Sequence, residues 1–167
     1  MPTPTYVAIA KTVLTGTATY VDFDSIPQTY TDLLIVASTR NDAGAGQQSI
    51  VVRNNKSAFS SARGLEGNGS AASSNSFANQ GSVANSTFTS NTFASSEFYL
   101  ANYTNTSNHQ TSSTTTNENN TTTITTGIRA TAAIDSQTVA VTSLRIANSV
   151  GSFVSGSRFD LYGIKNS

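Results

Sequence analysis

Apolar and polar residues alternate with a period of two in one segment of this chain after another, and this alternation constrains the fold most. It is clear in Thr5–Val13, Thr17–Phe23 and Gln137–Asn148. Successive side chains of a β-strand point to opposite faces, so the pattern predicts strands with one buried face. No segment has the spacing of an amphipathic helix. We therefore expect an all-β chain.

About eight such strands, separated by turn signals, predict an antiparallel two-sheet β-sandwich or jelly roll. We expect one single domain over residues 1–167. The segment Thr31–Arg40 is apolar on both faces, which is typical of a central strand or of one covered by a partner subunit. We expect it to form a hairpin with Ser49–Asn55. In Gln137–Asn148 the core candidates are Val139, Val141, Leu144 and Ile146.

Residues 56–96 are poor in aliphatic side chains and contain Gly64, Gly67 and Gly69. This composition predicts a long polar loop region, which in a compact domain is usually functional or ordered by a partner. The letters GLEGNG lack the Lys-Ser/Thr ending of a P-loop, and we interpret them as a tight turn with positive φ angles.

The charge balance excludes several partners. The chain has nine basic and nine acidic residues, and 11% of it is charged. Binding to nucleic acid or to an anionic membrane needs surplus Lys and Arg, so we expect neither. There is no cysteine, and we expect no cofactor. The first residues do not resemble a signal peptide, which predicts a soluble protein made in a cytoplasm.

Catalytic candidates are few. His109 is the only histidine, and its polar surroundings predict a solvated loop side chain. Asp22 and Asp24 share a strand face, but they are too few for a calcium site built from one segment. We expect a polar strand face there and no enzymatic activity.

A binding or structural role fits the residues better. The aromatic side chains of the polar segments could anchor a partner, or they could complete the core. The candidate partner contacts are Phe59, Phe77, Phe88 and Tyr103. For Phe98 and Tyr99 we expect core positions.

Several short motifs resemble a family of small structural proteins from the virions of tailed bacteriophages, frequent in phages of aquatic bacteria. The family pattern is F-x-x-I-P-Q-x-Y, then N-G/D…Y-S…R…G-x-G, then G-S-x-F-x-L-Y-G-I. The matching residues are Phe23, Ile26, Pro27, Tyr30, Asn54, Ser60, Arg63, Gly67, Gly69, Gly156, Ser157, Phe159, Leu161, Tyr162, Gly163 and Ile164. Phe59 stands where the family often has Tyr, and Arg129 where it often has Trp. These departures make both residues candidates for an altered contact surface.

The resemblance implies a virion component. Our first hypothesis is a capsid decoration (cement) protein on the outer surface of the head, a homotrimer bound to the major capsid protein. The alternative is a tail-fibre or receptor-binding module that recognises host carbohydrate through Asn102–Thr126, with Tyr103 and His109. A third hypothesis is a glycan depolymerase that uses Asp22, Asp24 or Glu66 as acids.

The segment Arg158–Ile164 carries apolar side chains on both faces, although it lies at the end of the sequence. We expect this strand to pair with Thr5–Lys11 or with a central strand, and so to close the sandwich. The residues expected to close it are Phe159, Leu161, Tyr162 and Ile164.

Overall fold

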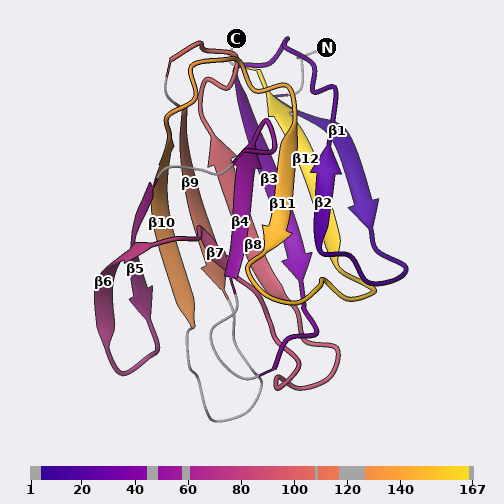
Figure 1. Ribbon diagram of the computed structural model, residues 1–167, viewed down its shortest axis with the longest axis vertical. Helices are drawn as coiled ribbons and strands as arrows, with labels where there is room; N and C mark the ends of the chain where they lie inside the picture. The colour runs from indigo at the N-terminus through magenta and orange to yellow at the C-terminus, as the bar shows by residue number, and fades with distance from the viewer. Residues whose placement is uncertain (1–4, 45–48, 58–60, 108, 117–126, 166–167) are drawn as a thin grey trace.

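The structure is a computed structural model, and it describes residues 5–44, 49–57, 61–107, 109–116 and 127–165. These residues form twelve β-strands and no helix, in two antiparallel sheets that lie face to face (Figure 1). The predicted all-β sandwich is confirmed.

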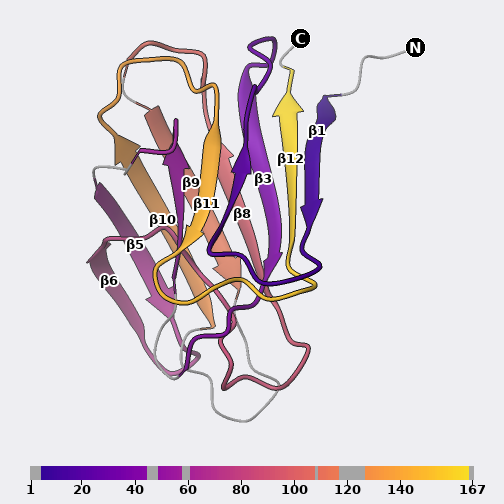
Figure 2. The same ribbon diagram turned by 45° about the vertical axis from the view of Figure 1, so that its right-hand side comes forward.

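The larger sheet has eight strands in the order β1–β12–β3–β8–β9–β10–β5–β6. Their bounds are Tyr6–Val13 (β1), Arg158–Ile164 (β12), Asp32–Thr39 (β3), Ala94–Leu100 (β8), His109–Thr116 (β9), Ile128–Asp135 (β10), Ser61–Gly67 (β5) and Ala72–Phe77 (β6). The smaller sheet has the order β2–β11–β4–β7, with bounds Tyr20–Phe23 (β2), Leu144–Asn148 (β11), Ser49–Asn54 (β4) and Gly81–Ser82 (β7). Both views place β5 and β6 at one side of the large sheet, beyond the small sheet (Figure 2).

The apolar core lies between the small sheet and the middle of the large one. Leu161, Ile35 and Phe98 are adjacent across β12, β3 and β8 and are almost fully buried. From the small sheet, Val52 and Ile146 close the other side. Each such side chain contributes about 1.5–3 kcal/mol through removal from water.

Two expectations about connections are wrong. β3 and β4 form no hairpin, because β3 pairs with β12 and β8 while β4 belongs to the other sheet. The segment expected as a polar loop, 56–96, contains β5, β6, β7 and the start of β8. The side chains of β6 are exposed except for Phe77 at its end, so backbone pairing with β5 holds the strand without an apolar pattern.

The glycine motif also differs from the prediction. Gly64 and Gly67 lie within β5, and only Gly69 has a positive φ angle. A Cβ on Gly64 would lie 2.5 Å from the carbonyl oxygen of Ala130, so this position needs glycine because the neighbouring strand is close. In the β11 segment, Val139 is exposed and is not a core residue, whereas Val141 is buried.

The last strand pairs with both strands that the sequence suggested. β12 lies between β1 and β3, with Tyr162 opposite Ala8 on one side and Leu34 on the other. Phe159 and Leu161 are fully buried, and Ile164 is nearly so. The strand is therefore interior to the sheet, and its position predicts that the sheet depends on it.

Candidate binding face

One face of the large sheet packs against the small sheet, and no other element of the described chain packs against its opposite face. We call this second face the open face. Its strands present apolar, polar and charged side chains, namely Tyr6, Ala8, Lys11, Arg158, Asp160, Tyr162, Ile164, Asp32, Leu34, Val36, Ser38, Ser95, Glu97, Tyr99, Gln110, Ser112, Thr114, Thr116, Ile128, Ala130, Ala132, Ile134, Arg63 and Leu65.

The open face mixes exposed apolar side chains with charged ones, since Val36 lies in register between Asp160 and Glu97. Tyr6, Leu65 and Ile128 are each at least half exposed, with relative exposures of 57%, 62% and 50%. Leu34 and Val36 on the central strand β3 are only half-buried. Exposed apolar side chains on one face of a sheet make that face a candidate interaction surface.

The strand registers place six side chains in one row across the open face. The row runs Tyr162, Leu34, Tyr99, Ser112, Ala132, Arg63. The small residues Ser112 and Ala132 lie between the long side chains of Tyr99 and Arg63. Because the side chains of Ser112 and Ala132 are shorter than those of Tyr99 and Arg63 on either side, the surface is lower between the two long side chains.

A shallow depression of about 480 Å³ lies at this place. Its lining includes Ser61, Arg63, Tyr99, Gln110, Ser112, Ala132 and Ile134. They come from β5, β8, β9 and β10, four neighbouring strands, so regular backbone pairing holds the lining in place. The groups comprise one phenol, one guanidinium, one amide, hydroxyls and an apolar floor.

Tyr99 is held in place by Asp32 on the neighbouring strand β3. Its hydroxyl donates a hydrogen bond of 2.6 Å to Asp32 Oδ2, and Oδ1 of Asp32 accepts the backbone N–H of Asn102 at 2.7 Å. The hydrogen bond to Asp32, together with burial and the nearby carboxylate charge, raises the pKa of Tyr99 to about 12. The phenol is therefore neutral at physiological pH and has one preferred orientation. Sequence reasoning expected Tyr99 in the core, and this is wrong, because Phe98 points inward and Tyr99 outward.

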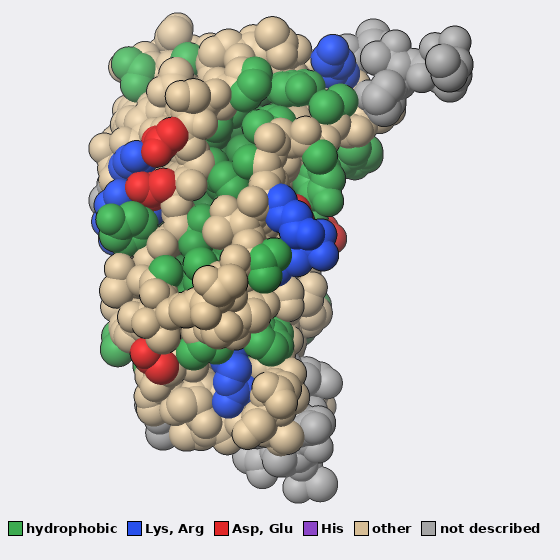
Figure 3. Space-filling model, turned by 90° about the vertical axis from the view of Figure 1, so that its right-hand side faces the viewer, with side chains coloured by type: hydrophobic (Ala, Val, Ile, Leu, Met, Phe, Trp, Pro, Cys, Tyr) green, Lys and Arg blue, Asp and Glu red, His purple; other side chains and the backbone are tan. Residues whose placement is uncertain are grey.

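A second apolar surface lies at the side of the sandwich where β1 and β2 are the outermost strands. Figure 3 shows hydrophobic side chains gathered in a band between two groups of charged side chains on this side. Ile9, Ala10, Leu14 and Tyr30 are partly buried and pack against the core. The band thus continues the core to the surface at an open side of the sandwich.

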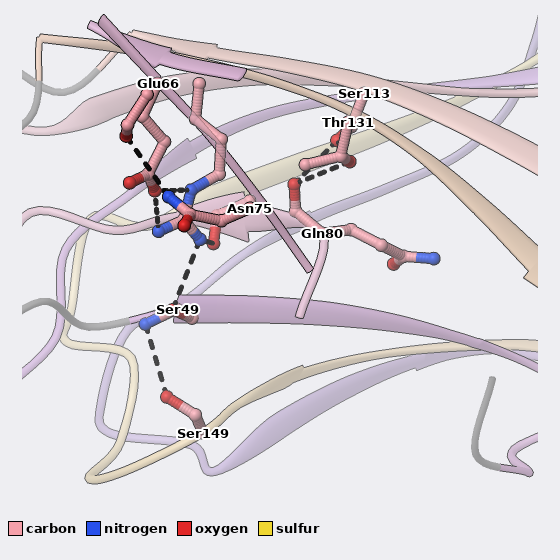
Figure 4. A network of polar contacts seen from close by, with 10 residues as sticks. Ser49, Glu66, Asn75, Gln80, Ser113, Thr131 and Ser149 are labelled. Atoms are coloured by element: carbon pink, nitrogen blue, oxygen red, sulfur yellow. Dashed lines mark hydrogen bonds and ion pairs between the residues drawn. The ribbon is translucent and has the colours of Figure 1, made fainter. Parts of the chain in front are cut away.

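Arg129 does not lie on a contact surface, contrary to the prediction. It is 2% exposed, points between the sheets from β10, and forms an ion pair with Glu66 on β5. Its guanidinium also donates to Ser49 Oγ and lies 4.5 Å from the centre of the Phe77 ring. Figure 4 shows these polar contacts continuing through Ser49 to Ser149 of the small-sheet side. Arg129 is therefore an internal tie between the two layers.

Gln80 is the centre of a second set of internal hydrogen bonds (Figure 4). Its carbonyl accepts the hydroxyls of Ser113 and Thr131, and its side-chain Oε1 accepts the N–H of Val52 at 2.6 Å. Under β9 and β10 the interior is consequently polar, and each buried group needs its partner.

Tyr103 and His109 are also placed differently from the prediction. Tyr103 is fully buried in the core, and its hydroxyl donates to the carbonyl of Pro27. His109 begins β9 and is 1% exposed, and its Nε2 donates to the carbonyl of Val139 at 2.8 Å. Neither side chain is available to a sugar at the surface. Their partners lie far away in the sequence, so composition carried no signal of their burial.

The other three predicted contact residues, all phenylalanines, differ in where they lie. Phe59 lies outside the described residues. Phe77 is half-buried under the Arg129 guanidinium, and Phe88 is half-buried in the loop after β7. That loop is held by Arg40, whose guanidinium donates to the carbonyls of Ser86, Phe88, Thr89 and Thr92.

The acidic candidates are engaged in ion pairs. Asp22 receives two hydrogen bonds of 2.8 Å from Arg145, and Lys56 pairs with both Asp22 and Asp24. The hydrogen bond from Arg145 lowers the pKa of Asp22, burial opposes this, and Lys56 lowers it further. In the described part of the chain, no three His, Cys, Asp or Glu side chains cluster as metal ligands. Those same ranges contain no helix that could span a membrane.

Together these features define an all-β sandwich with one large open face, an amphipathic depression on that face and a polar internal tie. Comparison of the chain with protein-family models, with curated proteins and with solved structures gave no significant match.

Proposed function

We propose that this chain is a structural protein of a tailed-bacteriophage virion, a capsid decoration protein that binds the lattice of the major capsid protein on the outer surface of the head. The sequence motifs shared with small phage virion proteins support the phage assignment. Near-zero net charge and the exposed apolar side chains of the open face favour a protein partner. In this proposal the chain has no catalytic role.

One observation carries the proposal of a protein partner. β3 is apolar on both faces, with Leu33 and Ile35 in the core and Leu34 and Val36 on the open face. A central strand that exposes apolar side chains on its outer side is ordinarily covered by another layer. A partner subunit would supply that layer.

The homotrimer is part of the proposal. β1 and β6 are the edge strands of the large sheet, and unpaired edges invite uncontrolled association unless they are covered. Cyclic association would cover them with copies of the same chain. Sedimentation of the purified protein tests this, and a monomer at all concentrations would contradict it.

The main experiment is binding of the purified protein to undecorated capsids. Leu34→Thr and Val36→Thr keep strand-forming residues but remove apolar surface, so we expect both to weaken capsid binding. Val150→Thr is the matched control, because Val150 is exposed at 59% outside the open face. Equal binding by all three variants, or only a few copies per particle, would count against the decoration role.

A second candidate function is recognition of host carbohydrate by a tail-associated module. The depression beside Tyr99 favours it, because aromatic and polar side chains meet there as they do in small-molecule sites. Binding of the purified protein to host cells, and its absence from heads, would support this candidate. Binding to capsids without binding to cells would contradict it.

A further inference from the structure

We infer that the depression between Tyr99 and Arg63 binds a carboxylated sugar, such as a uronic acid unit of a surface polysaccharide. This inference rests on the second candidate function and names its ligand. It concerns the isolated chain, so it holds or fails regardless of whether the protein sits on a head or a tail.

The size of the site suits one or two sugar rings. Tyr99 and Arg63 are three strands apart, which corresponds to about 14 Å between their backbones. Ser112 and Ala132 between them leave the space open. The volume of about 480 Å³ falls in the range of small-molecule sites, roughly 300–1,000 Å³.

Tyr99 supplies an aromatic surface that needs no reorganisation on binding. Its hydrogen bond to Asp32 restricts the ring in the unliganded protein. The C–H face of a pyranose ring carries partial positive charge and packs on the negative face of an aromatic ring. A ring that is already ordered loses little conformational entropy when the sugar binds.

Arg63 supplies the charge that selects a carboxylate. Its side chain is exposed, and within the described residues its one hydrogen bond goes to the carbonyl of Ala62. Most of its N–H groups therefore point to solvent, and a planar guanidinium binds a carboxylate through two parallel hydrogen bonds. Among the described residues, no carboxylate lines the depression to compete for it.

The remaining lining distinguishes a sugar from a simple anion. Gln110 offers an amide, and Ser61 and Ser112 offer hydroxyls, all able to exchange hydrogen bonds with sugar hydroxyls. Ala132 and Ile134 form an apolar floor between them.

Titration of the full-length protein with D-glucuronate, followed by NMR chemical shifts, tests the inference. D-glucose serves as the neutral probe and acetate as the simple anion. We expect glucuronate to bind at least about tenfold more tightly than either, because only glucuronate engages both Tyr99 and Arg63. The largest shifts should map to β8, β9, β10 and β5.

Variants then assign the two contacts. Arg63→Gln should weaken glucuronate binding about tenfold or more, and Tyr99→Ala should do the same, while Tyr99→Phe should retain most of the binding because the ring remains. Lys11→Gln and Tyr20→Ala are matched controls with an exposed cation and an exposed tyrosine outside the depression. Unchanged binding by Arg63→Gln would overturn the inference, as would equal affinity for glucose and glucuronate.

Two further outcomes would also overturn it. If glucuronate bound no better than acetate, the site would be an anion contact alone. If instead the chain self-associated in a manner abolished by Arg63→Gln, the depression would be a contact between copies. Loss of capsid binding in the experiment above would leave the sugar titration unaffected, so the two proposals can fail separately.

Discussion

The Tyr99 hydroxyl donates a 2.6 Å hydrogen bond to Asp32, a buried carboxylate at the start of the neighbouring strand β3. This bond and the carboxylate charge hold the phenol in its neutral form, with a pKa of about 12. A group whose pKa is raised on folding contributes stability that is present below its unfolded pKa, near 10, and that is lost as the pH rises towards 12.

The first prediction concerns this titration. In Asp32→Asn the Tyr99 pKa should fall towards 10, because the acceptor charge is gone. Ultraviolet difference absorption or NMR of the ring against pH measures it. Tyr99→Phe identifies the Tyr99 signal. An unchanged Tyr99 pKa in Asp32→Asn would mean that the hydrogen bond does not control the phenol.

The second prediction concerns the internal tie. Arg129→Met leaves Glu66 without its buried partner and should lower the free energy of unfolding by about 3 kcal/mol. Denaturant unfolding measures this loss. Adding Glu66→Gln should recover part of it, because the carboxylate charge that Arg129 had balanced is removed.

The matched control for the tie is Arg63→Met. Arg63 is exposed on the same strand as Glu66, so this change should alter stability by less than about 0.5 kcal/mol. Similar losses for Arg129→Met and Arg63→Met would contradict an internal role for Arg129.

Alternating side chains made the strand assignments possible wherever one face of a strand is apolar. β12 is the clearest case, because Phe159 and Leu161 alternate with Tyr162 and the segment could be recognised as an interior strand. For Phe98 and Tyr99 we expected core positions, although neighbouring residues of a strand point to opposite faces. The pattern did not tell which of the two faces a second layer covers, and Tyr99 was therefore misplaced.

Other errors came from partners that are remote in the sequence. Arg129 is buried because Glu66 lies opposite it, 63 residues earlier. Tyr103 is buried because Pro27 accepts its hydroxyl, 76 residues away. Serine-rich β6 could not be predicted, since all its side chains before Phe77 are exposed and mainly its backbone pairs.

The third prediction concerns Gly163 on β12. A Cβ at this position would lie 2.3 Å from the ring of Tyr30, so the ring occupies the place of a side chain. Gly163→Ala should therefore destabilise the protein by about 1–3 kcal/mol through overpacking. Thermal or denaturant unfolding measures the change.

Two further variants test whether the loss of stability comes from the clash with the Tyr30 ring or from any alanine substitution of a glycine. Gly163→Ala combined with Tyr30→Ala should cost less than the sum of the single changes, because the clash disappears. Gly16→Ala should change the free energy of unfolding very little, since nothing lies within 4 Å of its added Cβ. Strict additivity in the double variant would be evidence against the contact.

The fourth prediction concerns acid stability. The pKa of Asp22 is lowered in the folded protein, chiefly by its hydrogen bonds from Arg145. Its contribution to stability is therefore present above 3.8 and lost as the pH falls through the lower folded value. Asp22→Asn should cost about 1 kcal/mol at neutral pH and progressively less below pH 4.

Unfolding free energies measured between neutral and acidic pH test this dependence. Asp24→Asn is the control, because it removes only an exposed ion pair with Lys56. A difference between wild type and Asp22→Asn that stays constant down to the lowest pH would contradict the assignment.

The fifth prediction concerns the last strand. Truncation before Arg158 removes β12, which separates β1 from β3 and supplies Phe159 and Leu161 to the core. Loss of these two fully buried side chains alone costs about 3–6 kcal/mol, comparable to the whole stability of a small domain. The truncated chain should therefore give no cooperative unfolding transition and no dispersed NMR spectrum. Deletion of Asn166 and Ser167 alone is the control and should retain both. A folded, cooperatively unfolding chain that ends at Ser157 would show that β1 and β3 can close the sheet without β12.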